Sequence, residues 1–280
     1  GLVCGADAAE VGSRQGPPVR ALAALGQCLH CFDEAVRLAP RSGSARQARG
    51  LAYWALGVAQ KRIGMDPRTS YTKAILDDTE ALDLWPSGAG GIRNARGMAY
   101  MDRGRSIQQR GGEPWKDYEL SLTDLDEAVR LKPGDATSWN NRGCLRFEWA
   151  AALDGRGMDA ADKFDRAISD LTQGLAIDPG YLVCLGNRYK ASGLKGLSEA
   201  RAGKDPTASW EAALADVSKC IEADPKDWEL RKNRGCVLDD LGRYTEAVTE
   251  YEAAVRLSGG KADVKALLED ARAKAASGEK

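Results

Sequence analysis

Apolar residues recur along this chain at the three-to-four-residue spacing of an amphipathic helix, and the helical pattern itself repeats. One series of segments, among them FDEAVRLAP and LDEAVRLKP, ends each time at a proline, which a helix interior does not tolerate. These prolines recur at intervals of 46 or 47 residues, at Pro40, Pro86, Pro133, Pro179 and Pro225. A second series, among them ARGLAYWALG and ARGMAYMDRG, lies upstream with the same spacing. Each repeat is therefore predicted to contain two helices.

No segment alternates apolar and polar residues over enough positions to indicate a strand, and the composition favours helix, so we expect an all-α fold. One helix pair cannot bury its own apolar face, so the repeats should stack into one continuous solenoid domain. The repeats are predicted at 1–40, 41–86, 87–133, 134–179, 180–225 and 226–259, followed by a capping helix and tail at 260–280. The register begins the first helix at or before residue 1, so the first repeat should have a truncated first helix.

Small residues mark the points where the two helices of a repeat should cross. Gly50, Gly97, Gly143 and Gly235 recur in the first helices, and an aromatic residue opens most of the second helices. Together with the spaced prolines, these residues resemble the tetratricopeptide repeat family over nearly the whole chain. The resemblance implies a right-handed α–α superhelix of about six helical hairpins, closed by a C-terminal capping helix.

The repeats of this chain are longer than those of the family. The family's unit has about 34 residues, and only the last repeat here has that length. The others carry roughly 12 additional residues between their two helices. Three of these segments are predicted to start a helix with an acidic N-cap and a proline at the first helical position, at Asp66-Pro67, Glu113-Pro114 and Asp205-Pro206. We therefore expect both helices to be lengthened, to roughly 18–22 residues each.

A charged pair also recurs. An arginine precedes the reference position of the first helix, and an acidic residue follows at a fixed interval in the second. We predict a partly buried ion pair between the two helices that fixes their register more than it adds stability. The alternatives are two separately solvated charges, or arginines that anchor a ligand. The predicted pairs are Arg49 with Asp77, Arg96 with Asp124, Arg142 with Asp170, Arg188 with Asp216, and Arg234 with Glu250.

The resemblance also implies where a partner binds. In this family the first helices line a concave face that holds a peptide or helix, at the second, fifth, ninth, twelfth and thirteenth positions of each unit. These positions indicate an apolar strip in the N-terminal half and a polar, partly basic surface in the C-terminal half, where Arg231 adds to the basic residues. The candidate groove residues are Leu51, Trp54, Asn94, Met98, Met101, Asn140, Asn141, Cys144, Phe147, Asn187, Lys190, Lys232 and Asn233.

This surface would suit a partner segment with apolar anchors at one end and an acidic or carboxylate group at the other. The alternative is that the additional helix length buries the apolar strip inside the protein.

The cysteines raise the question of a metal site. Cys28 and Cys31 form a C-x-x-C around the only histidine, His30, and Cys4 could face them. A structural zinc needs four converging ligands, and on a helix His30 points away from the two cysteines. We therefore expect cysteines packed in the core and no metal. The remaining cysteines, Cys144, Cys184, Cys220 and Cys236, are also interpreted as core or groove residues.

Signals of catalysis are missing from the sequence. It contains no phosphate-binding loop, no His-Glu-x-x-His and no nucleophile elbow, and one histidine cannot supply a multi-histidine site. We expect no enzyme activity and no cofactor. The net charge of -1 gives no basic excess for nucleic acid, and no apolar run reaches the roughly 20 residues of a membrane-spanning helix. Seven scattered cysteines favour a reducing, cytoplasmic location.

The sequence therefore predicts a non-catalytic protein–protein interaction scaffold whose partner is another protein or peptide. The alternative is a regulatory or ligand-sensing domain of a larger enzyme, such as a kinase or protease, whose catalytic part lies upstream. Self-association through the N-terminal end is a third possibility.

Overall fold

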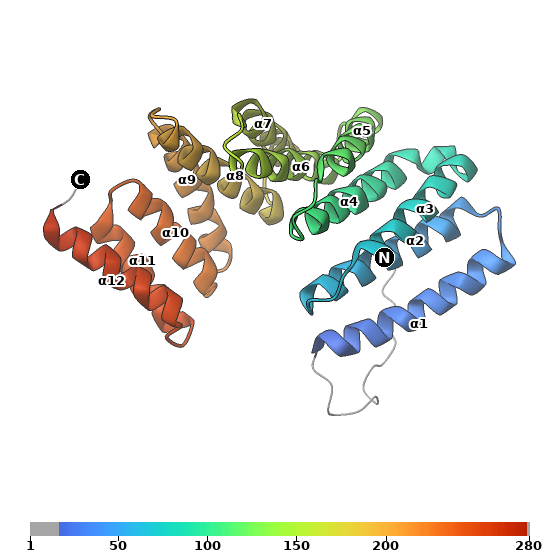
Figure 1. Cartoon of the computed structure of the whole chain (residues 1–280), viewed down its shortest axis with the longest axis horizontal. Coiled ribbons are helices and arrows are strands. Elements are labelled where there is room, and N and C mark those ends of the chain that lie inside the picture. The colour runs from blue at the N-terminus through green and yellow to red at the C-terminus, as the bar shows by residue number, and fades with distance from the viewer. Residues whose placement is uncertain (1–16, 279–280) are drawn as a thin grey trace. The chain divides into compact units, whose positions relative to one another are not determined.

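A computed structural model describes residues 17–278, and every regular element within that range is helical (Figure 1). The predicted all-α fold of helical hairpins with a closing C-terminal helix is confirmed there. The helices are α1 (Pro17–Leu38), α2 (Gly43–Arg62), α3 (Arg68–Leu84), the short 3₁₀ helix η1 (Pro86–Gly88), α4 (Ala89–Gln108), α5 (Trp115–Leu131), α6 (Ala136–Asp154), α7 (Ala161–Ile177), α8 (Leu182–Arg201), α9 (Thr207–Ala223), α10 (Trp228–Asp240), α11 (Tyr244–Leu257) and α12 (Ala262–Ser277).

The chain divides into two compact units, one on each side of the boundary between Pro133 and Gly134. In the N-terminal unit (residues 17–133), α1 packs on the hairpin α2–α3, which packs on the hairpin α4–α5. In the C-terminal unit (residues 134–278), the hairpins α6–α7, α8–α9 and α10–α11 follow one another, and α12 packs on α11. The first helix predicted for the repeat at 1–40 falls mainly outside the described residues, and α1 corresponds to the second helix of that repeat. The predicted repeat boundaries and the single continuous solenoid stay predictions.

Two kinds of residue end the helices at regular places. Each repeat proline lies two residues beyond the end of a second helix, as Pro86 does after α3 and Pro133 after α5. Within the hairpins, the loop after each first helix contains a glycine with positive φ, at Gly64, Gly111, Gly157, Gly203 and Gly242. A residue in the left-handed conformation allows backbone N–H groups to bond the last carbonyl groups of a helix. Glycine adopts this conformation without a steric penalty. These glycines reverse the chain between the paired helices.

The additional residues lengthen both helices of the long repeats, as predicted. The first helices α2, α4, α6 and α8 have 19 or 20 residues, against 13 in α10 of the short repeat. The second helices α3, α5, α7 and α9 have 17 residues, against 14 in α11, and are thus slightly shorter than expected.

The start of the second helices differs from the prediction by one residue. The proline precedes the helix instead of occupying its first position. The acidic side chain still accepts a hydrogen bond from the backbone two residues on, over 3.2 Å from Arg68 N–H to Asp66 and 3.0 Å from Thr207 N–H to Asp205. The acid–proline signal therefore correctly locates the turn at which the helix begins, but the acidic residue lies one position further from the helix than predicted.

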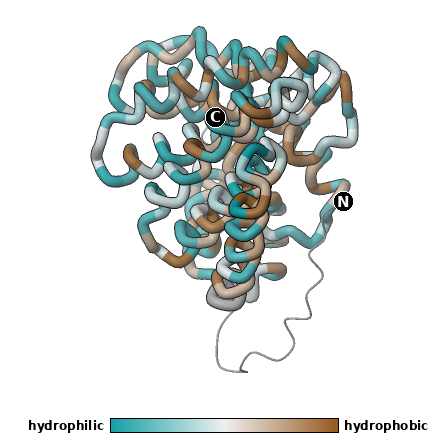
Figure 2. Tube along the Cα trace, turned by 90° about the vertical axis from the view of Figure 1, so that its right-hand side faces the viewer, coloured by the Kyte–Doolittle hydropathy of each residue, from teal (hydrophilic) through white to brown (hydrophobic). Residues whose placement is uncertain are grey.

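The core lies between the paired helices, where aromatic rings of the second helices pack on small residues of the first. The ring of Tyr71 lies against Gly57 and that of Tyr118 against Gly104, and both rings are fully buried. In the C-terminal unit the same positions bring Trp210 against Gly196. Hydrophobic residues occur along the chain in short stretches separated by hydrophilic ones (Figure 2). None of the helices described between residues 17 and 278 has both the length and the continuous hydrophobicity needed to cross a bilayer.

Candidate functional site

The recurring arginines and acids lie face to face across each hairpin. In the first four hairpins the guanidinium donates from Nε and Nη2 to both oxygens of the aspartate. The donor–acceptor distances range from 2.6 Å in the Arg49–Asp77 pair to 3.0 Å in the Arg142–Asp170 pair. The aspartate side chains are almost fully buried and the guanidinium groups partly buried. In the short hairpin, Arg234 pairs with Glu250 through one oxygen, and Arg231 contacts the other at 3.3 Å.

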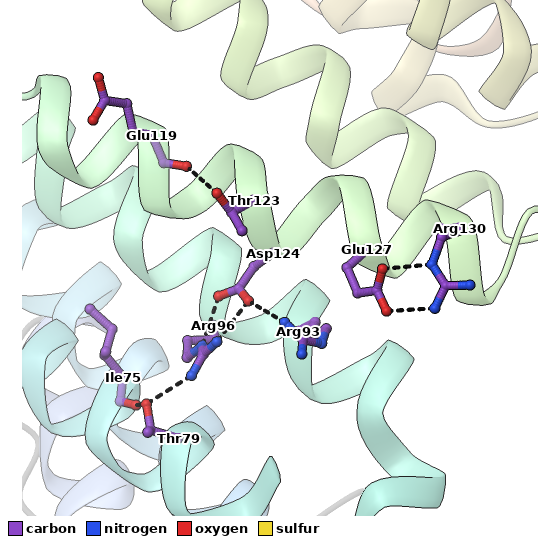
Figure 3. Close-up of polar contacts among 9 residues, drawn as sticks. All are labelled: Ile75, Thr79, Arg93, Arg96, Glu119, Thr123, Asp124, Glu127 and Arg130. Carbon is purple, nitrogen blue, oxygen red and sulfur yellow. Dashed lines mark hydrogen bonds and ion pairs between the residues drawn. The ribbon is translucent and has the colours of Figure 1, made fainter.

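Three of the arginines also reach the preceding repeat, which the sequence did not indicate. Figure 3 shows Arg96 between Asp124 of its own hairpin and Thr79 of α3, to whose hydroxyl it donates over 3.0 Å. Arg188 contacts Thr172 in the same way over 3.1 Å, and Arg49 contacts Asp33 of α1 over 3.0 Å. The hydrogen bonds that Arg49 donates to Asp77 raise the pKa of its guanidinium, so its charge is permanent. With their donors directed into the protein, these arginines connect successive repeats and are poorly placed to anchor a ligand.

The apolar strip predicted in the N-terminal unit is only partly accessible. Met101 has 1% of its surface exposed, so its side chain packs inside the unit and not on an open face. Trp54 is half-buried and donates its Nε1–H to Asp102 over 2.8 Å, which ties α2 to α4. Leu51 is exposed, whereas Asn94 and Met98 are half-buried. For Met101 the structure thus agrees with the alternative of burial.

Amide side chains in the C-terminal unit form contacts between neighbouring first helices. Asn187 donates from Nδ2 to Oδ1 of the buried Asn140 over 2.9 Å, and Asn140 in turn donates to the buried Asn141 over 3.1 Å. Asn233 donates to the hydroxyl of Tyr189 over 2.9 Å. The predicted groove amides of this unit therefore stabilise the packing of α6, α8 and α10, and Asn140 and Asn141 are not on its surface.

A mainly apolar pocket lies along the first helices of the C-terminal unit. It encloses about 390 Å³ and includes Phe147 from α6, which is half-buried, together with residues of α8 and α10. Three of the predicted groove residues, Phe147, Lys190 and Asn233, line it. The other lining residues are Tyr189, Gly193, Leu194, Leu197, Cys236, Val237 and Asp240.

A second pocket of about 290 Å³ lies where α8 and α10 begin. It shares Tyr189, Lys190 and Asn233 with the first pocket and is otherwise lined by Leu182, Gly186, Cys220, Asp224, Asp227, Glu229 and Leu230. Because the two pockets share three residues, they adjoin along α8 and α10, and we call the pair the α8–α10 groove.

Sequence reasoning missed several residues of the groove. Leu194 and Asp240 occupy the thirteenth position of their repeats and Glu229 the second, so the positional pattern contained the signal. Leu197 lies beyond the family's groove positions, on the part of α8 that the additional length creates. Partial desolvation, and then the neighbouring Asp239, raise the pKa of Asp240 to about 6, so this carboxyl is mainly ionised at neutral pH.

The cysteines differ from the prediction in one respect. Cys31 is exposed and Cys28 half-buried, so Cys31 is not a core residue. Cys4 lies outside the described residues. Cys184 and Cys220 are buried, and burial raises the pKa of Cys184 to about 11, which makes its thiol unreactive near neutral pH. Within residues 17–278, no group of histidine, cysteine and acidic side chains is arranged to hold a metal ion.

Comparison with known proteins identifies one repeat and a shared fold. Residues 233–260 match the family model described as tetratricopeptide repeat. A chain of the APC/C hetero-tetramer Cut9–Hcn1 aligns with a TM-score of 0.53 and 14% identity, over 91% of this chain and 42% of its own length. This chain thus spans less than half of that relative.

Two further solved structures have this fold. The C-terminal part of a TPR repeat-containing protein from Cytophaga hutchinsonii aligns with a TM-score of 0.53 and 14% identity, over 91% of this chain and 83% of its own. A thermophilic TPR protein from Thermus thermophilus aligns with a TM-score of 0.50 and 18% identity, over 79% of this chain and 98% of its own. No curated protein matches the chain in sequence.

Proposed function

Because this chain carries a tetratricopeptide repeat and has the fold of tetratricopeptide-repeat proteins, we propose that it is a non-catalytic scaffold that binds a segment of a partner protein. The segment, either extended or helical, lies in the α8–α10 groove. Repeat stacks of this kind suit protein partners, because their successive helices present a long row of side chains and no deep cavity.

The observation that carries the proposal is the composition of the groove. Leu194, Leu197 and Val237 bring apolar side chains to an open depression that Lys190 and Asn233 also line. Leu197 is 37% exposed. A partner that covered this side chain would gain a binding free energy of about 25 cal/mol for each Å² of apolar surface removed from water. Apolar pockets with a few polar groups at their rim are the usual form of a peptide-binding site.

The proposal is tested by changing the groove and comparing what the protein captures. Leu197→Asp places a charge in the apolar pocket, where it would be desolvated by a bound partner. We expect this variant to lose at least about 90% of the specifically bound protein that the wild-type chain recovers from an extract of its own cells, measured by quantitative mass spectrometry.

The matched control is Ile177→Asp, which replaces a similarly exposed side chain (42%) on α7, outside both pockets. It should capture the same proteins as the wild type. Circular dichroism checks that both variants are folded. Equal recovery by the two variants would exclude the groove as the binding site.

A further inference from the structure

Carboxylates dominate the charge of the α8–α10 groove. Asp224, Asp227 and Glu229 line the pocket where α10 begins, and Asp240 lines the pocket near its end. Lys190, which borders both pockets, is the single cationic side chain among the lining residues. This balance is the reverse of the partly basic surface that the sequence predicted.

The other basic residues expected there have different roles. Arg231 contacts Glu250 at 3.3 Å and thereby joins the ion pair of the last hairpin. The Nζ atom of Lys232 lies 5.5 Å from the centre of the Trp228 ring. Neither residue lines the groove, so neither offsets its carboxylates directly.

The carboxylates retain free hydrogen-bonding capacity. Within residues 134–278, Glu229 and Asp240 form no side-chain hydrogen bond or ion pair. Asp227 accepts the N–H groups of Glu229 and Leu230 with Oδ1 alone, which leaves Oδ2 open. Asp224 likewise uses only Oδ1, to accept the N–H of Lys226. Asp224, Asp227 and Glu229 line the same pocket, and like charges grouped in this way attract a cation and repel an anion.

From these observations we propose that the segment bound in the α8–α10 groove is basic and amphipathic. Its apolar side chain fills the pocket between Phe147, Leu197 and Val237, and a lysine or arginine lies against the carboxylates at the start of α10. This inference rests on the proposed function and specifies the chemistry of the partner. An arginine could bridge two of the open carboxylate oxygens, which a lysine cannot do with the same planar geometry.

A peptide array tests this chemistry directly. Twelve-residue peptides of Gly and Ser carry one Leu or Phe and one charged residue, separated by one to six positions, with Lys or Arg in one set and Asp or Glu in the other. A third set has the apolar residue alone. We expect the full chain to bind the best basic peptides at least about tenfold more tightly than their acidic counterparts at 0.1 M salt.

Charge-neutralising variants then locate the effect. The double variant Asp224→Asn, Glu229→Gln should lower the preference for basic over acidic peptides at least about fivefold, while binding of the uncharged peptides is retained. The control Glu222→Gln, Glu269→Gln makes the same change in net charge at exposed positions outside the groove and should preserve the preference.

Three other outcomes would overturn the inference, with different consequences. Equal or tighter binding of acidic peptides, abolished by Leu197→Asp, would refute the basic partner and leave the groove as a binding site. An equal loss in both double variants would mean that overall charge, not the groove, selects the peptide. No binding by any set would refute both the inference and the proposed function.

Discussion

Asp78 in α3 occupies a position that apolar residues fill in every later hairpin. It directly follows the paired acid Asp77, just as the buried Leu125 and Leu171 follow theirs. Its side chain is 1% exposed, and its Oδ1 atom has no hydrogen-bond partner. Desolvation raises the pKa of Asp78 to about 8, more than the nearby Arg96 lowers it. The carboxyl is therefore mainly protonated at neutral pH and acts as a poor substitute for leucine.

Replacing Asp78 by Leu should stabilise the protein and remove part of its pH dependence. The folded state holds a proton that the unfolded state releases above its ordinary pKa of 3.8, so the free energy of unfolding falls as pH rises from about 4 to 8. We expect Asp78→Leu to gain on the order of 2–4 kcal/mol at pH 8 and less at pH 5, in urea unfolding followed by circular dichroism. Asp83→Leu, at an exposed position of α3, should keep the wild-type pH slope; the same slope in both variants would contradict the assignment.

At the scale of elements, the close approach of paired helices depends on glycines in the first helix. A Cβ atom at Gly57 of α2 would lie 2.4 Å from Cε1 of Tyr71, whose ring is fully buried. The glycine is thus retained although alanine has the higher helix propensity, by up to about 1 kcal/mol.

Gly57→Ala should therefore destabilise the protein, by roughly 1–3 kcal/mol in thermal or urea unfolding, because the cost of overpacking exceeds the gain in propensity. The control is Gly91→Ala in α4 of the same unit, where the new methyl group would meet only Nε2 of Gln47, at 3.8 Å. That variant should be neutral or slightly more stable. Equal effects of the two changes would mean that helix propensity alone governs these positions.

At the scale of the molecule, a stack of repeats has ends that must be closed. In the C-terminal unit α12 provides this closure, since Val264, Leu268 and Ala271 are buried and Leu268 packs with Leu238 and Tyr251. The other faces of α12 are largely exposed, as expected of a terminal helix that faces water.

Leu268→Asp should expose this end and lower the free energy of unfolding by about 2–5 kcal/mol, because a buried leucine is lost and a charge is desolvated. Ala266→Asp, on the exposed side of the same helix, should change it by less than about 0.5 kcal/mol. Differential scanning calorimetry measures both. A small effect at Leu268 would show that α12 is not required to close the unit.

The sequence by itself determined the elements and their pairing. Helix periodicity, the spaced prolines and the small residues at the crossings depend on neighbours a few residues apart or on the repeat interval, so they can be read without coordinates. The arginine–acid pairs could be predicted in the same way, because an interval that repeats in the sequence brings the same two positions together in each helix pair.

Tertiary structure alone decided which side chains remain accessible and which sign of charge predominates in the groove. Met101 and Asn140 occupy groove positions but are buried, whereas Leu197, outside the family's positions, lines the α8–α10 groove. Arg231 was expected to make that surface basic, yet it pairs with Glu250. The physical reason is that accessibility and electrostatic potential sum over all neighbouring helices, so a single repeat position does not specify them.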